Sequence, residues 1–161
     1  MDDYERANSL NERLIAGNNA WAEASVWDQG AGKALHLMLS QLVRLIGDDE
    51  PKYLVTAIDN PDDVDTGYSV TVFTDAHIYK LTGRGLEQPV TEVLSRAGLE
   101  RLFVESVRIT TTTHQALAGK SRTQVRLEYP NLTVTLPGGR SIKVDAALDE
   151  LLPSLIADLD K

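Results

Sequence analysis

The chain has 161 residues, a net charge of −8 at pH 7 and no cysteine. Its length suits one domain that folds without disulfides or metals, and the missing thiols exclude disulfide frameworks, thiolate metal sites and cysteine nucleophiles. The acidic balance opposes binding to nucleic acids and to anionic membranes, because their phosphates repel negative charge. The acidic start and the lack of an apolar run of about 18 residues predict a cytoplasmic protein.

The first 50 residues carry the spacing of helices. Residues 2–16 place Leu10, Leu14 and Ile15 on one side, which predicts an amphipathic helix. A wider stripe predicts a second helix that is buried on more than one side or forms a seam between copies. The stripe contains Leu35, Met38, Leu39, Leu42 and Ile46, widened by Leu37, Val43 and Leu45.

From Lys52 onward the apolar period changes to two, which is typical of antiparallel strands with one buried face. Residues 90–102 interrupt this pattern and predict a short helix. The chain then ends in a predicted amphipathic helix with Asp145 as its N-cap, and Pro153 either kinks this helix or marks its start. The predicted strands cover residues 52–58, 68–74, 76–81, 104–112, 124–129, 132–136 and 141–144.

These elements predict an α+β fold in one domain, residues 1–161. A helical lead-in, residues 1–50, is expected to pack on an antiparallel sheet with a C-terminal helix, residues 52–161. A domain boundary near residue 50 is the alternative that this pattern leaves open.

Seven strands followed by a helix, together with the hairpin sequence VTVFTDAHIY at residues 70–79, resemble bacterial pleckstrin-homology-like domains. The resemblance implies a bent seven-stranded sheet or barrel, closed at one end by the C-terminal helix. Another small antiparallel barrel, or an open sheet covered by helices, remains possible. Members that bind phosphoinositides place basic residues around the first loop. Here the loop at residues 59–67 is acidic, so we do not expect phosphoinositide binding.

No motif in the sequence predicts a metal, a cofactor or a reaction. The carboxylates at residues 59–65 lack the spacing of a calcium loop and fit a solvated turn. Gly119-Lys120-Ser121 lacks the earlier glycine of a phosphate-binding loop. His36, His77 and His114 lack zinc spacing, and we interpret them as ordinary structural or surface histidines.

Two tryptophans, Trp21 and Trp27, are the candidate partner-binding residues, because neighbouring aromatic side chains often mark interfaces. The structural interpretation is that both fill the seam between the first helices and the sheet. The sequence therefore predicts a non-enzymatic protein-interaction or scaffold module. A self-assembling structural protein is one alternative, and a small enzyme or ligand carrier with a pocket that the sequence does not reveal is another.

Overall fold

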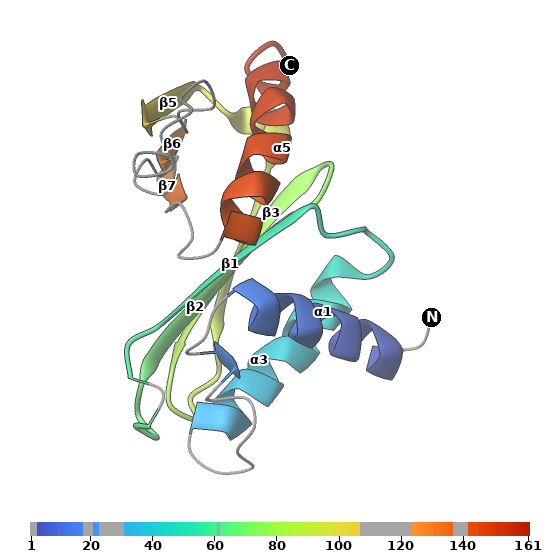
Figure 1. The fold of residues 1–161 in the computed structure, drawn as a ribbon, viewed down its shortest axis with the longest axis vertical. Helices are drawn as coiled ribbons and strands as arrows, with labels where there is room; N and C mark the ends of the chain where they lie inside the picture. Colours follow the sequence, from blue (N-terminus) through green and yellow to red (C-terminus); the bar gives the residue numbers. More distant parts are fainter. Residues whose placement is uncertain (1–2, 18–20, 23–30, 61, 107–123, 137–141) are drawn as a thin grey trace. The chain divides into compact units, whose positions relative to one another are not determined.

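The chain is described here by a computed structural model that covers residues 3–17, 21–22, 31–60, 62–106, 124–136 and 142–161 (Figure 1). It divides into two compact units, Met1–Leu94 and Ser95–Lys161. The fold is a mixed α+β fold, and its described strands form two antiparallel sheets rather than one closed barrel. No helix in the described ranges is long and apolar enough to cross a membrane.

In the described part of the first unit, the helices α1 and α3 join a four-stranded sheet with the strand order β1-β2-β3-β4. Gly47 follows the second helix with a φ of 60° and ends it in the left-handed conformation that glycine tolerates. The elements are α1 (Asp3–Gly17), α3 (Ala31–Ile46), β1 (Tyr53–Ile58), β2 (Gly67–Phe73), β3 (His77–Arg84) and β4 (Val90–Ser95).

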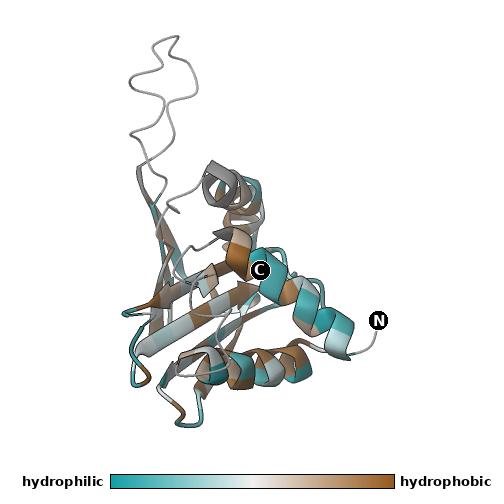
Figure 2. Ribbon diagram, turned by 60° about the horizontal axis from the view of Figure 1, so that its bottom comes forward, coloured by the Kyte–Doolittle hydropathy of each residue, from teal (hydrophilic) through white to brown (hydrophobic). Residues whose placement is uncertain are grey.

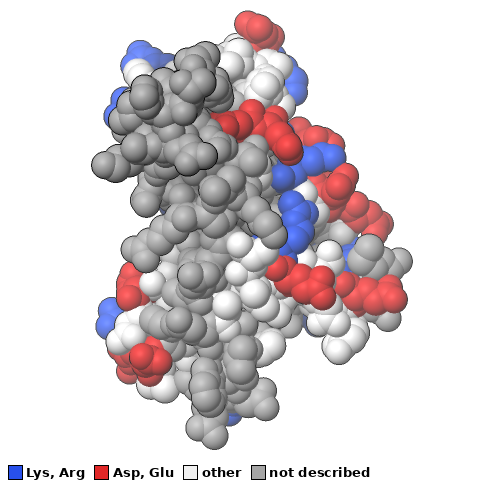
Figure 3. Space-filling view, viewed as in Figure 1, with Lys and Arg blue, Asp and Glu red and all other residues white. Residues whose placement is uncertain are grey.

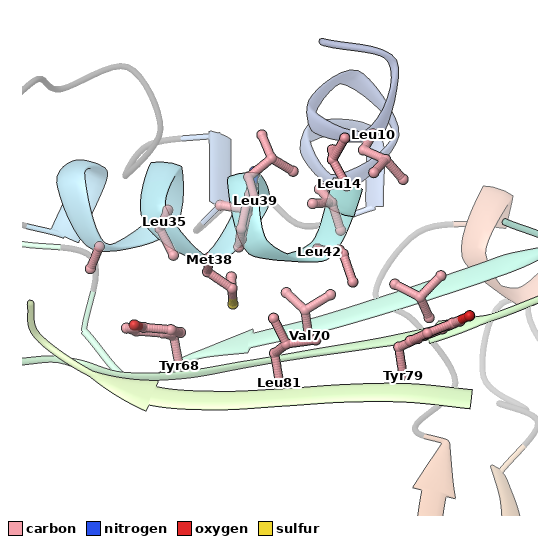
Figure 4. Close-up of a cluster of buried hydrophobic side chains, with 14 of the residues drawn as sticks. Leu10, Leu14, Leu35, Met38, Leu39, Leu42, Tyr68, Val70, Tyr79 and Leu81 are labelled. Atoms are coloured by element: carbon pink, nitrogen blue, oxygen red, sulfur yellow. The ribbon is translucent and has the colours of Figure 1, made fainter. Parts of the chain in front are cut away.

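The core of this unit lies between the two helices and one face of the sheet (Figure 4). Met38 and Leu42 of α3 point toward Val70 of β2 and Leu81 of β3, and all four side chains are fully buried. Both α1 and α3 pack on the sheet of the first unit. The boundary between the two compact units lies after Leu94.

The two helices differ in how much of their surface is apolar. In Figure 2 the helix that leads to the N label is mostly hydrophilic, with hydrophobic positions between the polar ones. Its buried leucines, Leu10 and Leu14, face the core. The helix α3 buries residues along its whole length, which explains the wide apolar stripe in its sequence.

The second unit contains a three-stranded antiparallel sheet with the order β5-β6-β7 and a C-terminal helix. Tyr129 pairs with Leu132 across a two-residue turn, so β6 and β7 form a hairpin as predicted. The helix buries a stripe that contains Leu148, Leu151 and Leu155. The elements are η1 (Arg96–Gly98), β5 (Arg101–Ser106), β6 (Gln124–Tyr129), β7 (Leu132–Leu136) and α5 (Ile142–Asp158).

Two sequence-based assignments are wrong. One strand was missed and another was predicted in excess, so the number of predicted strands equals the number of described ones. The predicted helix at residues 90–102 is the strand β4 followed by the short helix η1. Its β-branched residues favour extended backbone, and pairing with β3 outweighs a weak helical spacing. The predicted strand at residues 141–144 is wrong because α5 begins at Ile142. Alternation over four residues is too short to separate strand from helix.

Three further boundaries differ from the predictions. Asp145 lies inside α5 and does not precede it, and Pro153 also lies inside the helix, so the helix does not begin there. The strand β5 begins at Arg101, three residues before the predicted start. Residues 107–112 of that predicted strand lie outside the described residues.

A buried ion pair ties η1 to the C-terminal turn of α5 in the second unit. Nε and Nη2 of Arg96 both lie 2.7 Å from Oδ2 of Asp158, and the two side chains are 3% and 1% exposed. Arg96 also donates to Oγ of Ser154 at 2.8 Å, while Lys161 Nζ donates to the second Asp158 oxygen at 2.8 Å. A buried charge that loses its partner is costly, so this pair requires both of its members.

We predict that Arg96→Met and Asp158→Leu each lower the free energy of unfolding by about 3–5 kcal/mol, because each leaves one buried charge without its partner. The double variant should regain much of this loss. Urea unfolding measures the effect. Arg101→Met is the matched control, since Arg101 is exposed and lies 3.8 Å from its partner Glu128. An Arg96→Met protein as stable as the control would contradict the prediction.

Tyr129 lies beside this ion pair, and its buried hydroxyl has no hydrogen-bond partner among the described residues. Burial raises the pKa of Tyr129 to about 12, the charge of Asp158 adds to the rise, and Arg96 opposes it. The folded state therefore holds the phenol proton more tightly than the unfolded chain, in which a tyrosine pKa is about 10. Its contribution to stability is complete below about pH 10 and is lost as the pH rises toward about 12.

We predict that Tyr129→Phe flattens the decline of unfolding free energy between about pH 10 and about pH 12. Denaturant unfolding at several pH values measures the slope. A residual slope should remain, because burial also raises the pKa values of Tyr68 and Tyr79. If the unfolding free energy of the variant declined with pH as steeply as that of the unmodified protein, the pKa of Tyr129 would be the same in the folded and unfolded states.

Candidate functional site

Trp21 is part of the core of the first unit. Its side chain is fully buried, and its indole nitrogen donates to Oδ1 of Asn11 at 3.0 Å. This placement fits the structural interpretation of Trp21, because a buried indole presents no surface to a partner. Trp27 lies outside the described residues, so its predicted binding role stays a prediction.

Of the three histidines, the structure describes His36 and His77, which lie on different elements. His36 is exposed on α3, while His77 lies at the start of β3 with Nδ1 3.9 Å from Oδ2 of Asp49. His114 and Gly119-Lys120-Ser121 lie outside the described residues. In the described part of the chain, no group of three or more histidine, aspartate or glutamate side chains is arranged to hold a metal ion.

The acidic loop between β1 and β2 uses its polar side chains to hold its own backbone. Oδ1 of Asn60 accepts from the amide of Asp62 at 3.1 Å, and Oδ1 of Asp63 accepts from the amide of Asp65 at 3.0 Å. These are the local bonds by which asparagine and aspartate form turns. The loop therefore has the hydrogen bonding expected of a turn between two strands.

A surface that the sequence did not reveal lies where α3 meets β4. Nε2 of Gln41 donates to Oγ1 of Thr91 at 2.8 Å, which places one flank of the helix beside the strand. Leu37 and Leu45 lie one helical turn to either side of Gln41, and Val93 shares the strand face of Thr91. We call these five residues the α3–β4 surface.

The apolar members of this surface are exposed although they adjoin a packed core. Leu37 is 54% exposed, Val93 is 51% exposed and Leu45 is 39% exposed. β4 is an edge strand, since β3 is its one hydrogen-bonded neighbour among the described strands. Proteins usually protect such edges with charges, prolines or covering segments. Here Val90, on the other strand face, is exposed as well.

The exposed side of α3 is basic, in contrast to the acidic chain. Lys33, His36 and Arg44 are exposed, and the helix contains no aspartate or glutamate. On the face drawn in Figure 3, several of the described basic side chains lie beside acidic ones.

A pocket of about 410 Å³ lies within the first unit, between α1 and the connector from α3 to β1, residues 47–51. This volume is in the range of small-molecule sites. We call it the α1–connector pocket. It is lined by Arg6, Ser9, Leu10 and Arg13 of α1, Val43 and Ile46 of α3, and Gly47, Asp48, Asp49, Glu50 and Pro51 of the connector.

Two arginines of α1 hold the ends of this connector. Nη1 of Arg6 donates to the carbonyl oxygen of Gly47 at 2.7 Å, and Nη1 of Arg13 donates to the carbonyl oxygen of Pro51 at 2.7 Å. Arg6 also lies 3.1 Å from Oδ1 of Asp48. Burial lowers the pKa of Arg13, and the charge of Glu50 opposes this shift.

No protein-family model matches the sequence, and comparisons with curated proteins and with solved structures found no significant match. The α3–β4 surface and the α1–connector pocket are the two features of the described residues that suggest a function.

We predict that Arg6→Met lowers the free energy of unfolding by about 1–3 kcal/mol, because the Gly47 carbonyl loses a charged donor. Asp48→Asn should change it little, since Asp48 is 97% exposed and solvent screens its ion pair. Urea unfolding of both variants checks the contrast. Equal losses would show that the ion pair, and not the carbonyl bond, holds the connector.

Proposed function

We propose that this protein is a non-enzymatic interaction module whose α3–β4 surface binds an extended, acidic segment of a partner protein. The observation that carries the proposal is an edge strand with exposed valines beside an exposed apolar helix flank. The partner segment would add a strand to the sheet next to β4 and place alternate side chains against α3.

Strand addition fits the chemistry of this edge. An edge strand presents backbone N–H and C=O groups that pair with an incoming strand, and these bonds supply affinity. Side chains of the incoming strand alternate between the two sheet faces, so every second one would reach Leu37, Leu45 and Val93. Burial of their exposed surface would add to the binding free energy, at about 25 cal/mol per Å².

Charge complementarity selects an acidic partner. Lys33 and Arg44 are exposed on α3, and no acid on that helix neutralises them. Acidic side chains on the incoming segment would be attracted to these two cations, whereas basic ones would be repelled. The same charges speed association at low ionic strength and lose influence at high salt.

The proposal includes a pleckstrin-homology-like arrangement. Its support is the element order, in which seven antiparallel strands precede a C-terminal helix. Recognition of a peptide along a sheet edge needs no catalytic group, which agrees with the lack of a catalytic motif in the sequence.

Self-association is the second candidate function. Most of the wide apolar stripe on α3 is buried in the core of the same chain, which leaves Leu37 and Leu45 exposed. Two copies could pair through their β4 edges and cover these leucines. Light scattering at high protein concentration separates this outcome, because self-pairing predicts a dimer and partner binding predicts a monomer.

The test uses a peptide of alternating valine and glutamate and a matched peptide in which lysine replaces glutamate. We predict that the acidic peptide shifts the NMR signals of β4 and α3, and that the basic peptide binds at least about ten times more weakly. Val93→Lys should abolish binding, because it places a cation on the apolar surface. Val64→Lys is the control, since Val64 is also about half exposed but lies in the β1–β2 loop.

Two results would overturn the proposal. Equal binding of both peptides would show that the site does not select acidic segments. Shifted signals outside β4 and α3 would show that the peptide binds elsewhere than the α3–β4 surface. A dimer that Val93→Lys converts to a monomer would replace the partner segment with a second copy of the chain.

A further inference from the structure

The charged groups of the α1–connector pocket are mostly paired with one another or with near neighbours. Arg6 pairs with Asp48 at 3.1 Å, and Glu50 pairs with Lys52 at 2.8 Å. The third acid, Asp49, places its Oδ2 3.9 Å from Nδ1 of His77. Two of the three acids of the pocket, Asp48 and Glu50, therefore already have a cationic partner.

Arg13 is the exception. Its guanidinium donates to the Pro51 carbonyl, but no carboxylate of the described residues lies within 4.0 Å of it. A guanidinium has five N–H donors in a planar fork, and apart from the bond to Pro51 those of Arg13 have no partner among the described residues. Arg13 is an exposed residue of α1, and the part of its guanidinium that is buried lowers its pKa, while the charge of Glu50 opposes this shift. Such a fork favours a carboxylate bound through two parallel hydrogen bonds.

The rest of the lining suits an apolar body. Leu10, Val43 and Ile46 are core side chains whose edges reach the pocket, and Pro51 adds a fourth apolar wall. Ser9 contributes one hydroxyl to the lining. One available cation beside such a surface matches a ligand with one negative charge. A polyanion would bring more negative charge than Arg13 alone can offset, and the three acids of the connector would repel the surplus.

We propose that the α1–connector pocket binds a small monocarboxylic acid with an apolar body, whose carboxylate pairs with Arg13. The site is separate from the α3–β4 surface and does not depend on the interaction proposed there. The sequence left open that the protein is a ligand carrier. The proposal names the pocket residues and the class of ligand for that alternative.

The test is an NMR titration of the full chain with hexanoate, and with hexanol, hexylamine and inorganic phosphate as comparison ligands. Hexanoate should shift the Arg13 side-chain signal and the backbone signals of residues 47–51, with a dissociation constant on the order of 1 mM. Hexanol and hexylamine should bind at least about ten times more weakly, because neither supplies a carboxylate.

Variants then separate the roles of charge and geometry. Arg13→Gln should weaken hexanoate binding at least about tenfold, and Arg13→Lys should retain part of it, because lysine keeps the charge but not the fork. Arg84→Gln is the control, since Arg84 is exposed at the end of β3 and does not line the pocket. The Arg13 side-chain signal of the unmodified protein provides a readout that needs no variant.

Three outcomes would overturn the inference. Equal binding of hexanol would show an apolar pocket that does not recognise carboxylates. Phosphate binding as tight as hexanoate would show a general anion site. Hexanoate binding without a shift of the Arg13 signal would place the ligand elsewhere.

Discussion

The apolar side chains of α3 pack against β2 and β3, and the arrangement of the first unit depends on this contact. Met38 and Leu42 lie over Val70 and Leu81, and all four are fully buried. Removal of one such leucine typically costs 2–5 kcal/mol in stability. The contact fixes the rotation of α3, which determines that Leu37 and Leu45 remain outside the core. It also sets the end of α3, from which the connector passes under the arginines of α1.

Both candidate sites lie at the borders of the core that α3 forms with β2 and β3. β4 is the last strand in the order of the four-stranded sheet, so it forms an edge, and its valines are exposed. At the other boundary, arginine–carbonyl hydrogen bonds join α1 to the connector, and a pocket remains between them. One site is an open strand edge and the other is a pocket with an available cation. They therefore suit different ligands.

Local patterns in the sequence predicted much of the fold. Residues that alternate between apolar and polar identified β6 and β7, whose buried positions alternate with more exposed ones. β-branched and aromatic residues identified β2 and β3. The helix spacing of Leu35 to Ile46 identified α3. The sequence did not identify β4, since Val90 and Val93 are both exposed and their spacing carries no alternation. That strand exists because β3 pairs with it, which is a tertiary effect.

The candidate sites could not be predicted from local patterns for a related reason. Leu37 and Leu45 look like their buried neighbours in the sequence, and the position of β4 decides which flank of α3 stays open. Arg6 and Arg13 look like ordinary charges on a polar helix face, and their carbonyl partners lie 41 and 38 residues away. Trp21 is the opposite case. Tryptophan is a residue type that often marks interfaces, but this one is buried in the core.

The central claim is that β4 is an open edge that is available for pairing. Amide hydrogen exchange of the protein without a partner tests this claim most directly, because exchange reports which backbone N–H groups lack protection. Every second amide of β4 should exchange much faster than the amides of β2 and β3, in the alternation of an edge strand with one neighbour. Uniform protection along β4, as strong as in β2, would show that the edge is covered and would contradict the account.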